Sequence, residues 1–416
     1  MAPHPDRNFW LLVGDAGFFA LAIVCFDPSV VLPVFVAQFT ASPILIGAAA
    51  AIKLAGLYLP QLPVAIGIRH LRSTKPFFFW QAAVGRAALL GCVLAAAWAA
   101  SVPPAAVVLL VLVAWAVFSF TEGAATLAWL DLVGDVVDSR LRGRYFGIIQ
   151  FLGGVLSIGG GFAVRQALAG DQAPATFAWL FGAGCIPFAL SVACIGGIQQ
   201  RSTPRPSLEP ANAEPPLDQV LSLLRGGHLL RLGVAQILAS SLQLALPFYV
   251  LFARDRLGLS GDWIGSFIVA QTVGMAIAAL LWARVAEWYG ARLVVCLSGA
   301  VLIVIPLLPV LAERVAAAEG VLLLGVFVLA GAARGGQQAG FWQYLLDLVP
   351  ARDRRVFMGL ANTANAPSLL MPLIGGALLA WGGYPWLFAG SIVLGIGATL
   401  AGLALATPHP QPTPAD

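Results

Sequence analysis

Apolar segments of roughly 20 residues or more recur along the whole chain, and they constrain its fold more than any other feature. A helix rises about 1.5 Å per residue, so each segment is long enough to cross a hydrocarbon core about 30 Å thick. Charged residues make up only 10% of the 416 residues, whereas soluble domains carry about 25%. The pattern therefore predicts a membrane protein built from spanning helices.

One long polar stretch divides these segments into two groups of six. The sequence at 201–228 is rich in proline at first and then amphipathic, which predicts a linker with a short helix on the membrane surface. We expect an all-α membrane protein with twelve transmembrane helices in two pseudo-symmetric six-helix bundles. The bundles would occupy 1–200 and 229–416, the second with a short cytoplasmic tail, joined by a cytoplasmic linker at 201–228. The predicted spans lie at approximately 10–37, 44–68, 76–100, 104–131, 145–168, 177–199, 229–253, 263–284, 293–312, 321–346, 357–380 and 386–406.

The basic residues indicate how the chain is oriented. Most of the 23 Lys and Arg residues fall in loops that would share one side of the membrane with both termini. Because cytoplasmic loops carry the excess of Lys and Arg, we expect both termini to lie in the cytoplasm. The predicted location is the bacterial inner membrane, spanned many times.

The two halves also resemble each other in sequence. The tetrapeptide LDLV occurs at 130–133 and again at 346–349, each time before a cluster of arginines. Further along, FAWLFGAG at 177–184 is similar to YPWLFAGS at 384–391. Parallel repeats of six spans are a known way to build a transporter.

Twelve spans, a long central loop and two similar halves resemble the major facilitator superfamily over nearly the whole chain. The family's loop signature after the eighth span has a counterpart in ARVAEWYGAR at 283–292, with Glu287, Gly290 and Arg292 at the matching places. The first-half copy, GIRHLRSTKP at 67–76, has Leu71 in place of the acid and Thr74 in place of the glycine. The loops that begin at Asp131 and Asp347 also resemble the family's inner loops. The resemblance implies that Glu287, Gly290, Arg292, Asp131 and Asp347 belong to gating loops.

Four predicted spans carry a polar face, and by the family's architecture these four line a central cavity. A polar face against lipid is costly, so it must face protein or water. The substrate-binding candidates on the fourth, seventh and tenth spans are Arg334, Gln337, Gln338, Trp342, Trp129, Gln236 and Gln243. The glutamines have an alternative role as hydrogen-bonding links between helices, and the tryptophans have one as packing aromatics.

Charged residues inside the spans are the remaining candidates. Asp27 and Lys53 lie at similar depths, as do Glu122 and Arg86, and each pair is a candidate salt bridge within the first half. Arg334 has no acidic residue at its depth in the second half. Its partner is therefore Glu122 or Asp27 across the cavity, an anionic group of the substrate, or backbone carbonyls. Proton coupling would fall to Asp27 or Glu122.

The sequence contains no catalytic or nucleotide-binding constellation. Its four histidines lie in tails and loops without metal-ligand spacing, and no phosphate-binding glycine loop followed by Lys-Ser or Lys-Thr occurs. We expect no enzyme activity, no metal, no cofactor and no nucleic-acid partner. The expected partners are a small-molecule substrate, protons or another ion, and membrane lipid, with the protein acting as a monomer.

The sequence thus predicts a secondary active transporter that moves a small organic solute, anionic in one version, by proton-coupled alternating access. An alternative is a proton-antiport efflux pump for drugs or metabolites, although the fifth span (FLGGVLSIGGGF, 151–162) lacks the proline of the family's antiporter signature. A third option is a non-transporting sensor or lipid-handling protein on the same fold.

Overall fold

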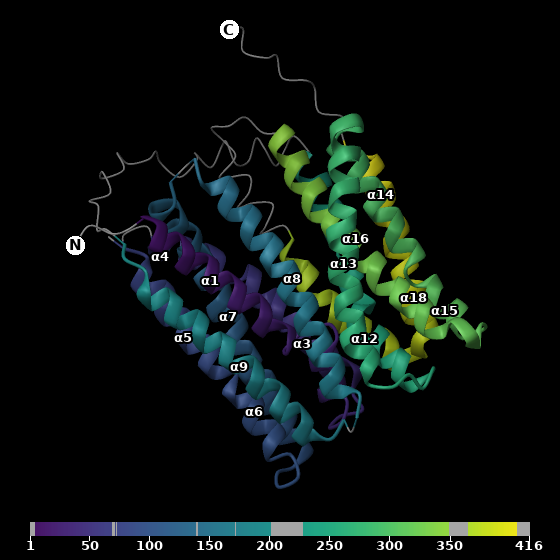
Figure 1. The fold of residues 1–416 in the computed structure, drawn as a ribbon. Coiled ribbons are helices and arrows are strands. Elements are labelled where there is room, and N and C mark those ends of the chain that lie inside the picture. The colour runs from purple at the N-terminus through teal and green to yellow at the C-terminus, as the bar shows by residue number, and fades with distance from the viewer. Residues whose placement is uncertain are drawn as a thin grey trace.

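The computed structural model describes residues 5–68, 71, 73–138, 140–170, 172–200, 228–348 and 365–405, and the regular structure in these ranges is entirely helical. The helices form two bundles that lie side by side (Figure 1). The chain is therefore an all-α protein with two six-helix halves, as the sequence predicts. Nearly all of the predicted linker falls at 201–227, outside the described residues.

Among the described residues, the first bundle contains nine helices because several spans are broken. A break at Asp27 and Pro28, where the proline removes a backbone donor, divides the predicted first span into two helices. The helices are α1 (Pro5–Val24), α2 (Val31–Val36), α3 (Pro43–Tyr58), α4 (Gln61–Ile68), α5 (Lys75–Ala88), α6 (Leu90–Ala97), α7 (Pro104–Val136), α8 (Arg142–Leu168) and α9 (Pro174–Gly197).

The second bundle resembles the first in having broken first and third spans and a long fourth span, whereas its second span is one continuous helix. Its elements are α11 (His228–Ala239), α12 (Leu242–Asp255), α13 (Asp262–Tyr289), α14 (Ala291–Val304), α15 (Leu307–Ala312), η1 (Ala316–Ala318), α16 (Glu319–Leu348), η2 (Ala366–Leu370) and α18 (Met371–Leu403). We call the end of the molecule where α1 begins and α18 ends the termini side, and the opposite end the far side (Figure 1).

The described helices account for twelve crossings. Ten stretches are long and apolar enough to span a membrane, and α3 is a shorter apolar helix. One of the ten, Ala366–Leu403, folds back on itself at Gly383, whose φ of 72° departs from helix geometry. Gly390 lies next to Leu378, although a straight helix would hold these residues about 18 Å apart. Counting this stretch as two crossings and adding α3 gives twelve spans, in agreement with the sequence.

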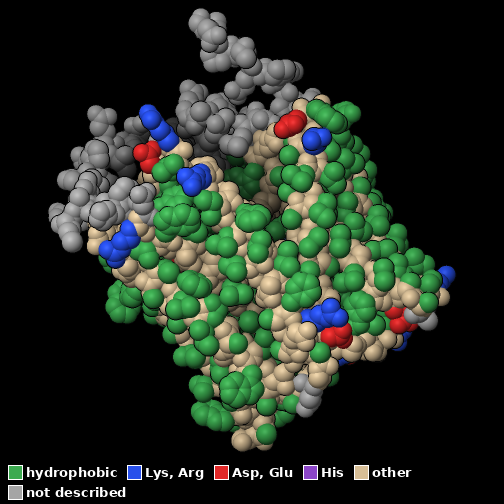
Figure 2. Space-filling model, in the orientation of Figure 1, with side chains coloured by type: hydrophobic (Ala, Val, Ile, Leu, Met, Phe, Trp, Pro, Cys, Tyr) green, Lys and Arg blue, Asp and Glu red, His purple; other side chains and the backbone are tan. Residues whose placement is uncertain are grey.

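The surface has the character of a membrane protein. Figure 2 shows a broad apolar band between two zones where charged side chains gather near the ends of the bundles. Large apolar side chains point outward within that band, and Trp179 of α9 is 83% exposed. Such residues are stable only against lipid, because water would favour their burial.

Small residues bring the helices of each bundle close together in equivalent places. In the first bundle Gly123 of α7 packs on the backbone of Gly56 of α3. In the second, Gly331 of α16 packs on the backbone of Gln271 of α13. These contacts are typical of helix association in membranes, where close approach replaces the hydrophobic effect.

Candidate functional site

A pocket of about 890 Å³ lies between the two bundles. Its lining comes from α1, α5, α7 and α8 of the first bundle and from α13 and α16 of the second. Phe78, Trp129 and Trp342 line it near the termini-side ends of their helices, and Figure 2 shows a hollow between the bundles at that end. The volume falls within the range of about 300–1,000 Å³ that is typical of sites for small organic ligands.

The two bundles close against each other on the far side. Gly161 of α8 packs on Gly265 of α13, and Gly376 of α18 packs on the backbone of Pro43, where α3 begins. Arg165 and Asp262 form an ion pair of 3.7 Å at the same end. The pocket is thus open towards the termini side and closed towards the far side.

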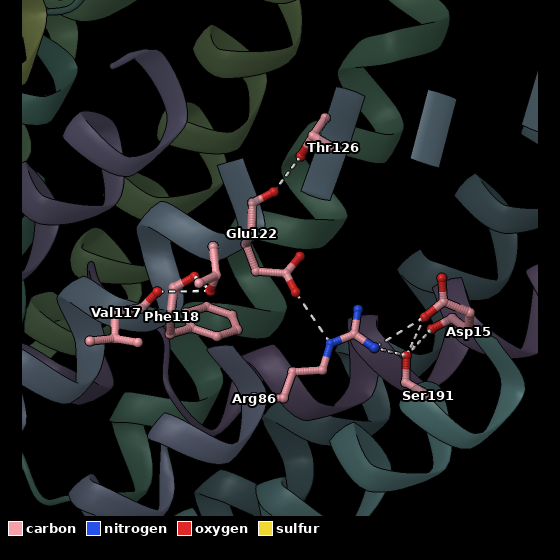
Figure 3. A network of polar contacts seen from close by, with 8 residues as sticks. Asp15, Arg86, Val117, Phe118, Glu122, Thr126 and Ser191 are labelled. Carbon is pink, nitrogen blue, oxygen red and sulfur yellow. Dashed lines mark hydrogen bonds and ion pairs between the residues drawn. The ribbon is translucent and has the colours of Figure 1, made fainter. Parts of the chain in front are cut away.

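A buried arginine and two carboxylates form the most connected polar group on the pocket wall (Figure 3). Arg86 of α5 donates from Nε to Glu122 Oε1 of α7 at 3.2 Å, and from Nη1 to Asp15 Oδ1 of α1 at 3.3 Å. The Arg86 side chain is 4% exposed and that of Glu122 13%. We call Asp15, Arg86 and Glu122 the charge triad.

The surroundings of Arg86 hold it in one place. Its Nη1 also donates to Ser191 Oγ of α9 at 2.7 Å, and the Ser191 hydroxyl in turn donates to Asp15. The guanidinium carbon lies 5.4 Å from the ring centroid of Phe19 and 5.8 Å from that of Phe188. One guanidinium faces two carboxylates, so the triad carries one surplus negative charge when all three groups are ionised. A surplus charge in an apolar interior is costly, and uptake of one proton removes it.

A second set of charges lies deeper between the bundles. Arg334 of α16 interacts electrostatically with Asp27 and with Lys53 of α3. Lys53 Nζ lies 5.1 Å from the ring centroid of Phe118 and 5.8 Å from that of Trp115. Asp27 Oδ1 accepts the backbone N–H of Ser29 at 2.8 Å.

Of the two salt bridges predicted from residues at equal depth, the structure contains one. Arg86 and Glu122 are brought together as expected. Lys53 and Asp27 form no ion pair in the described part of the chain, because Asp27 lies beyond the end of α1 and turns back to its own backbone. The guanidinium of Arg334 has no hydrogen bond or ion pair there either, and its link to Asp27 is electrostatic only.

Three of the predicted substrate-binding residues line the pocket, namely Gln338, Trp342 and Trp129. Gln337 instead donates from Nε2 to the carbonyl oxygen of Ala239 at 2.9 Å and so links α16 to α11. Gln236 of α11 is half-buried, and its Oε1 is buried without a hydrogen-bond partner among the described residues. Gln243 is half-buried in α12.

The predicted gating-loop residues lie on the termini side. Glu287 is exposed near the end of α13, Gly290 joins α13 to α14 with a φ of 81°, and Arg292 donates to the carbonyl oxygen of Leu403. Asp131 is half-buried in α7. Asp347 lies in the last turn of α16, with its side chain outside the described residues.

Sequence reasoning missed two members of the Arg86 network. Asp15 lies ten residues into α1 and Arg86 eleven into α5, each about 15 Å from the termini side, so depth alone could have suggested the pair. Ser191 carried no such signal, since a serine in a spanning helix more often bonds its own backbone.

The comparisons with known proteins agree with this architecture. The Major Facilitator Superfamily model matches residues 232–416, which is the second half of the chain. No curated protein matches the chain in sequence. Solved structures match almost the whole chain in fold, although their sequences are at most distantly similar.

Three of these structures illustrate the likeness. A bacterial homologue of the iron transporter ferroportin in an inward-facing state has a TM-score of 0.72 at 14% identity, covering 96% of this chain and 98% of that chain. The nucleoside transporter NupG has a TM-score of 0.69 at 15% identity, covering 96% and 98%. A D-xylose-proton symporter has a TM-score of 0.69 at 16% identity, covering 98% of each chain.

The arrangement of two six-helix halves is the fold of these solved membrane transporters. In sequence, the second half of the chain is similar to the major facilitator superfamily, and in fold the whole chain is similar to the three transporters above.

Proposed function

We propose that the protein is a secondary active transporter that carries a small organic solute by alternating access and couples this movement to protons at the charge triad. The observation that carries the proposal is the position of the triad: Asp15, Arg86 and Glu122 all line the pocket between the bundles. A group that both holds a surplus charge and faces the solute can link protonation to solute binding. We further propose that the protein works as a monomer in a bacterial inner membrane, with both termini and the mouth of the pocket in the cytoplasm.

The coupling follows from the cost of burying charge. When the pocket is open, water reaches Glu122 and tolerates the surplus negative charge of the triad. Closing the termini side removes that water, so the charged form resists closure and the protonated form allows it. Protonation of either carboxylate suffices, because Arg86 then pairs with the one that stays ionised. This role favours Glu122 and Asp15 over Asp27, whose Oδ1 already accepts the N–H of Ser29.

One observation favours proton-antiport efflux as a second candidate. Five aromatic residues line the pocket together with the surplus carboxylate: Phe19, Phe78, Phe151, Trp129 and Trp342. A lipophilic cation would suit such a lining through cation–π contacts, and it would compete with the proton for the triad.

Reconstituted protein in liposomes with an internal pH dye tests the proposal. Solutes are added at an imposed pH gradient, and a transported solute is recognised by proton movement into or out of the lumen. We expect Glu122→Gln and Asp15→Asn to lose solute accumulation against a gradient while solute exchange across the membrane continues. Glu313→Gln, on an exposed carboxylate that pairs with Arg256, is the matched control and should behave as the original chain does. Gradient-driven accumulation that survives in both triad variants would refute the coupling.

A further inference from the structure

Two cations from opposite bundles have no hydrogen-bond or ion-pair partner in the part of the chain that the structure describes. Lys53 belongs to α3 of the first bundle, Arg334 to α16 of the second, and the two interact electrostatically. Neither side chain makes a hydrogen bond or ion pair with any residue that the structure describes. Arg334 is an exposed side chain within an apolar helix, and Gly335 and Gln338 beside it line the pocket.

Lys53 is held in place without being neutralised. Its ammonium lies over the rings of Phe118 and Trp115, and Trp115 is fixed by its indole N–H, which donates to the carbonyl oxygen of Ala49 at 2.8 Å. An aromatic face attracts a cation through its quadrupole and leaves its charge free to act on an anion. Phe118 also stacks on Phe19, which lines the pocket. Lys53 thus lies one aromatic layer from the pocket wall.

Asp27 cannot neutralise both cations. Its charge interacts with Arg334, and its Oδ1 already accepts the backbone N–H of Ser29. The negative charge of Glu122 also attracts Lys53, but the Glu122 carboxylate already accepts a hydrogen bond from Arg86. The set of Lys53, Arg334 and Asp27 therefore has one surplus positive charge, the opposite of the triad.

The six charges of the two sets are balanced until a proton arrives. Asp15, Asp27 and Glu122 carry three negative charges, and Lys53, Arg86 and Arg334 carry three positive ones. One proton on the triad leaves a net charge of one positive unit between the bundles. With a proton on the triad and a single negative charge on the solute beside Lys53 and Arg334, each of the two sets is neutral in itself, and this is the state in which the site can close at lowest cost.

We propose that Lys53 and Arg334 bind the anionic group of the solute from the two bundles, so that the cargo is a small organic monoanion such as a carboxylate, carried together with one proton. This inference rests on the proposed transport function and names its substrate class. In the empty protein the two cations repel each other across the gap and oppose closure. A carboxylate between them replaces repulsion by two attractions, and the planar fork of Arg334 suits its two oxygens.

Ligand binding to purified protein tests the charge requirement. The probes are aliphatic and aromatic monocarboxylates, each paired with the amide of the same shape and with a primary amine of similar size, and the readout is the shift in thermal unfolding. We expect at least one carboxylate to stabilise the protein while its amide and amine counterparts do not. Stabilisation by amines or amides alone, or by no carboxylate at any pH tested, would overturn the inference.

Substitutions then test the two residues named. For the carboxylate that stabilises best, we expect Lys53→Gln and Arg334→Gln each to weaken binding at least tenfold. Arg334→Lys should recover part of the loss, because it returns the charge without the fork. The matched control is Arg256→Gln, on an exposed far-side arginine, which should bind as the original chain does. Unchanged affinity in both Gln variants would overturn the inference even if carboxylates bind.

The charge carried during transport separates this inference from the proposed function. A monoanion moving with one proton is electroneutral, so uptake should not change when a potassium gradient and valinomycin impose a membrane potential. Proton-driven transport of a cation or an uncharged solute would leave the proposed function standing and overturn only the substrate class. Carboxylate binding that depends on Lys53 and Arg334, without transport of any solute, would support the anion site and refute the transporter.

Discussion

Gly265 of α13 packs directly on the backbone of Gly161 of α8, with no room for a Cβ between the two helices. A Cβ on Gly265 would overlap the carbonyl oxygen of Gly161 and the amide of Arg165, both of which are backbone groups that cannot rotate away. This contact closes the far side of the pocket across the two bundles. It can exist only in the conformation that is open to the termini side.

Gly265→Ala should therefore favour the opposite conformation. Overpacking costs about 1–3 kcal/mol, which corresponds to a shift of roughly 5- to 150-fold towards the far-side-open form. Val269, which packs on Gly161, gives a reporter position. In a chain without its native cysteines, Val269→Cys should react faster with a membrane-impermeant maleimide when Gly265→Ala is present.

The control for this prediction is Gly159→Ala, which lies on α8 as Gly161 does but outside the contact with α13. Gly159 of α8 has no neighbouring atom within 4 Å of a built Cβ, so its substitution should change neither labelling nor transport. If Gly265→Ala labels like its parent and transports normally, the contact is not the far-side gate.

The ion pair at the same end should matter much less. Arg165 and Asp262 are 3.7 Å apart, and their side chains are 46% and 27% exposed. Pairs of this kind contribute about 0–1 kcal/mol, so Arg165→Gln should change the rate of Val269→Cys labelling by less than about fivefold. An effect as large as that of Gly265→Ala would show that charge, rather than backbone contact, holds the far side closed.

Much of the fold could be predicted from hydropathy, because span length and number depend on composition alone. The breaks are harder to predict. Pro28 marks the interruption after α1, but the interruption between α11 and α12 at Ser240 and Ser241 has no proline. Each break changes the direction in which later side chains point. Asp27 was paired with Lys53 by depth, yet it lies in the first of these breaks and faces its own backbone.

The contacts in the site could be predicted only where the depth of a residue along its helix was sufficient to identify its partner. The ion pair of Glu122 and Arg86 could be predicted from their equal depth, because both residues lie in unbroken parts of α7 and α5. The rotation of a helix about its axis is not fixed by depth, and the long α7 is apolar on nearly every side. Asp15 and Ser191 join the network through the packing of α1 and α9, which pairwise patterns in the sequence do not encode.

Removing Arg86 should destabilise the first bundle. Arg86→Gln leaves two buried carboxylates without their cation. Removing one partner of a buried ion pair costs about 3–5 kcal/mol of stability. Adding Asp15→Asn removes the more deeply buried of the two and should recover part of that stability, since Glu122 borders the pocket. Thermal unfolding in detergent measures both variants. A double variant no more stable than Arg86→Gln would contradict the account of the triad as a charge-balanced unit.

Trp342 should contribute to solute affinity through its ring. It lines the pocket and is 41% exposed. Aromatic contacts contribute about 0.5–1.5 kcal/mol beyond burial, so Trp342→Ala should weaken binding of the transported solute by roughly 2- to 13-fold. Trp342→Phe should retain most of the affinity. Trp179→Ala, on the outer surface, is the control, and an equal loss there would attribute the effect to the bilayer rather than to the pocket.

Gly290 should be required for its backbone conformation rather than for its small size. Its φ of 81° and ψ of 164° lie in a region that only glycine adopts readily, while no atom lies within 4 Å of a Cβ built on it. Gly290→Ala should therefore lower stability by about 1–3 kcal/mol, and Gly290→Asn should not rescue it, because asparagine tolerates a different positive-φ region. Gly182→Ala, inside α9 and equally uncrowded, should instead be neutral or stabilising by about 0.5–1 kcal/mol, since alanine is the better helix former. Denaturation curves in detergent compare the variants, and losses of equal size at the two glycines would show that conformation is not the cause.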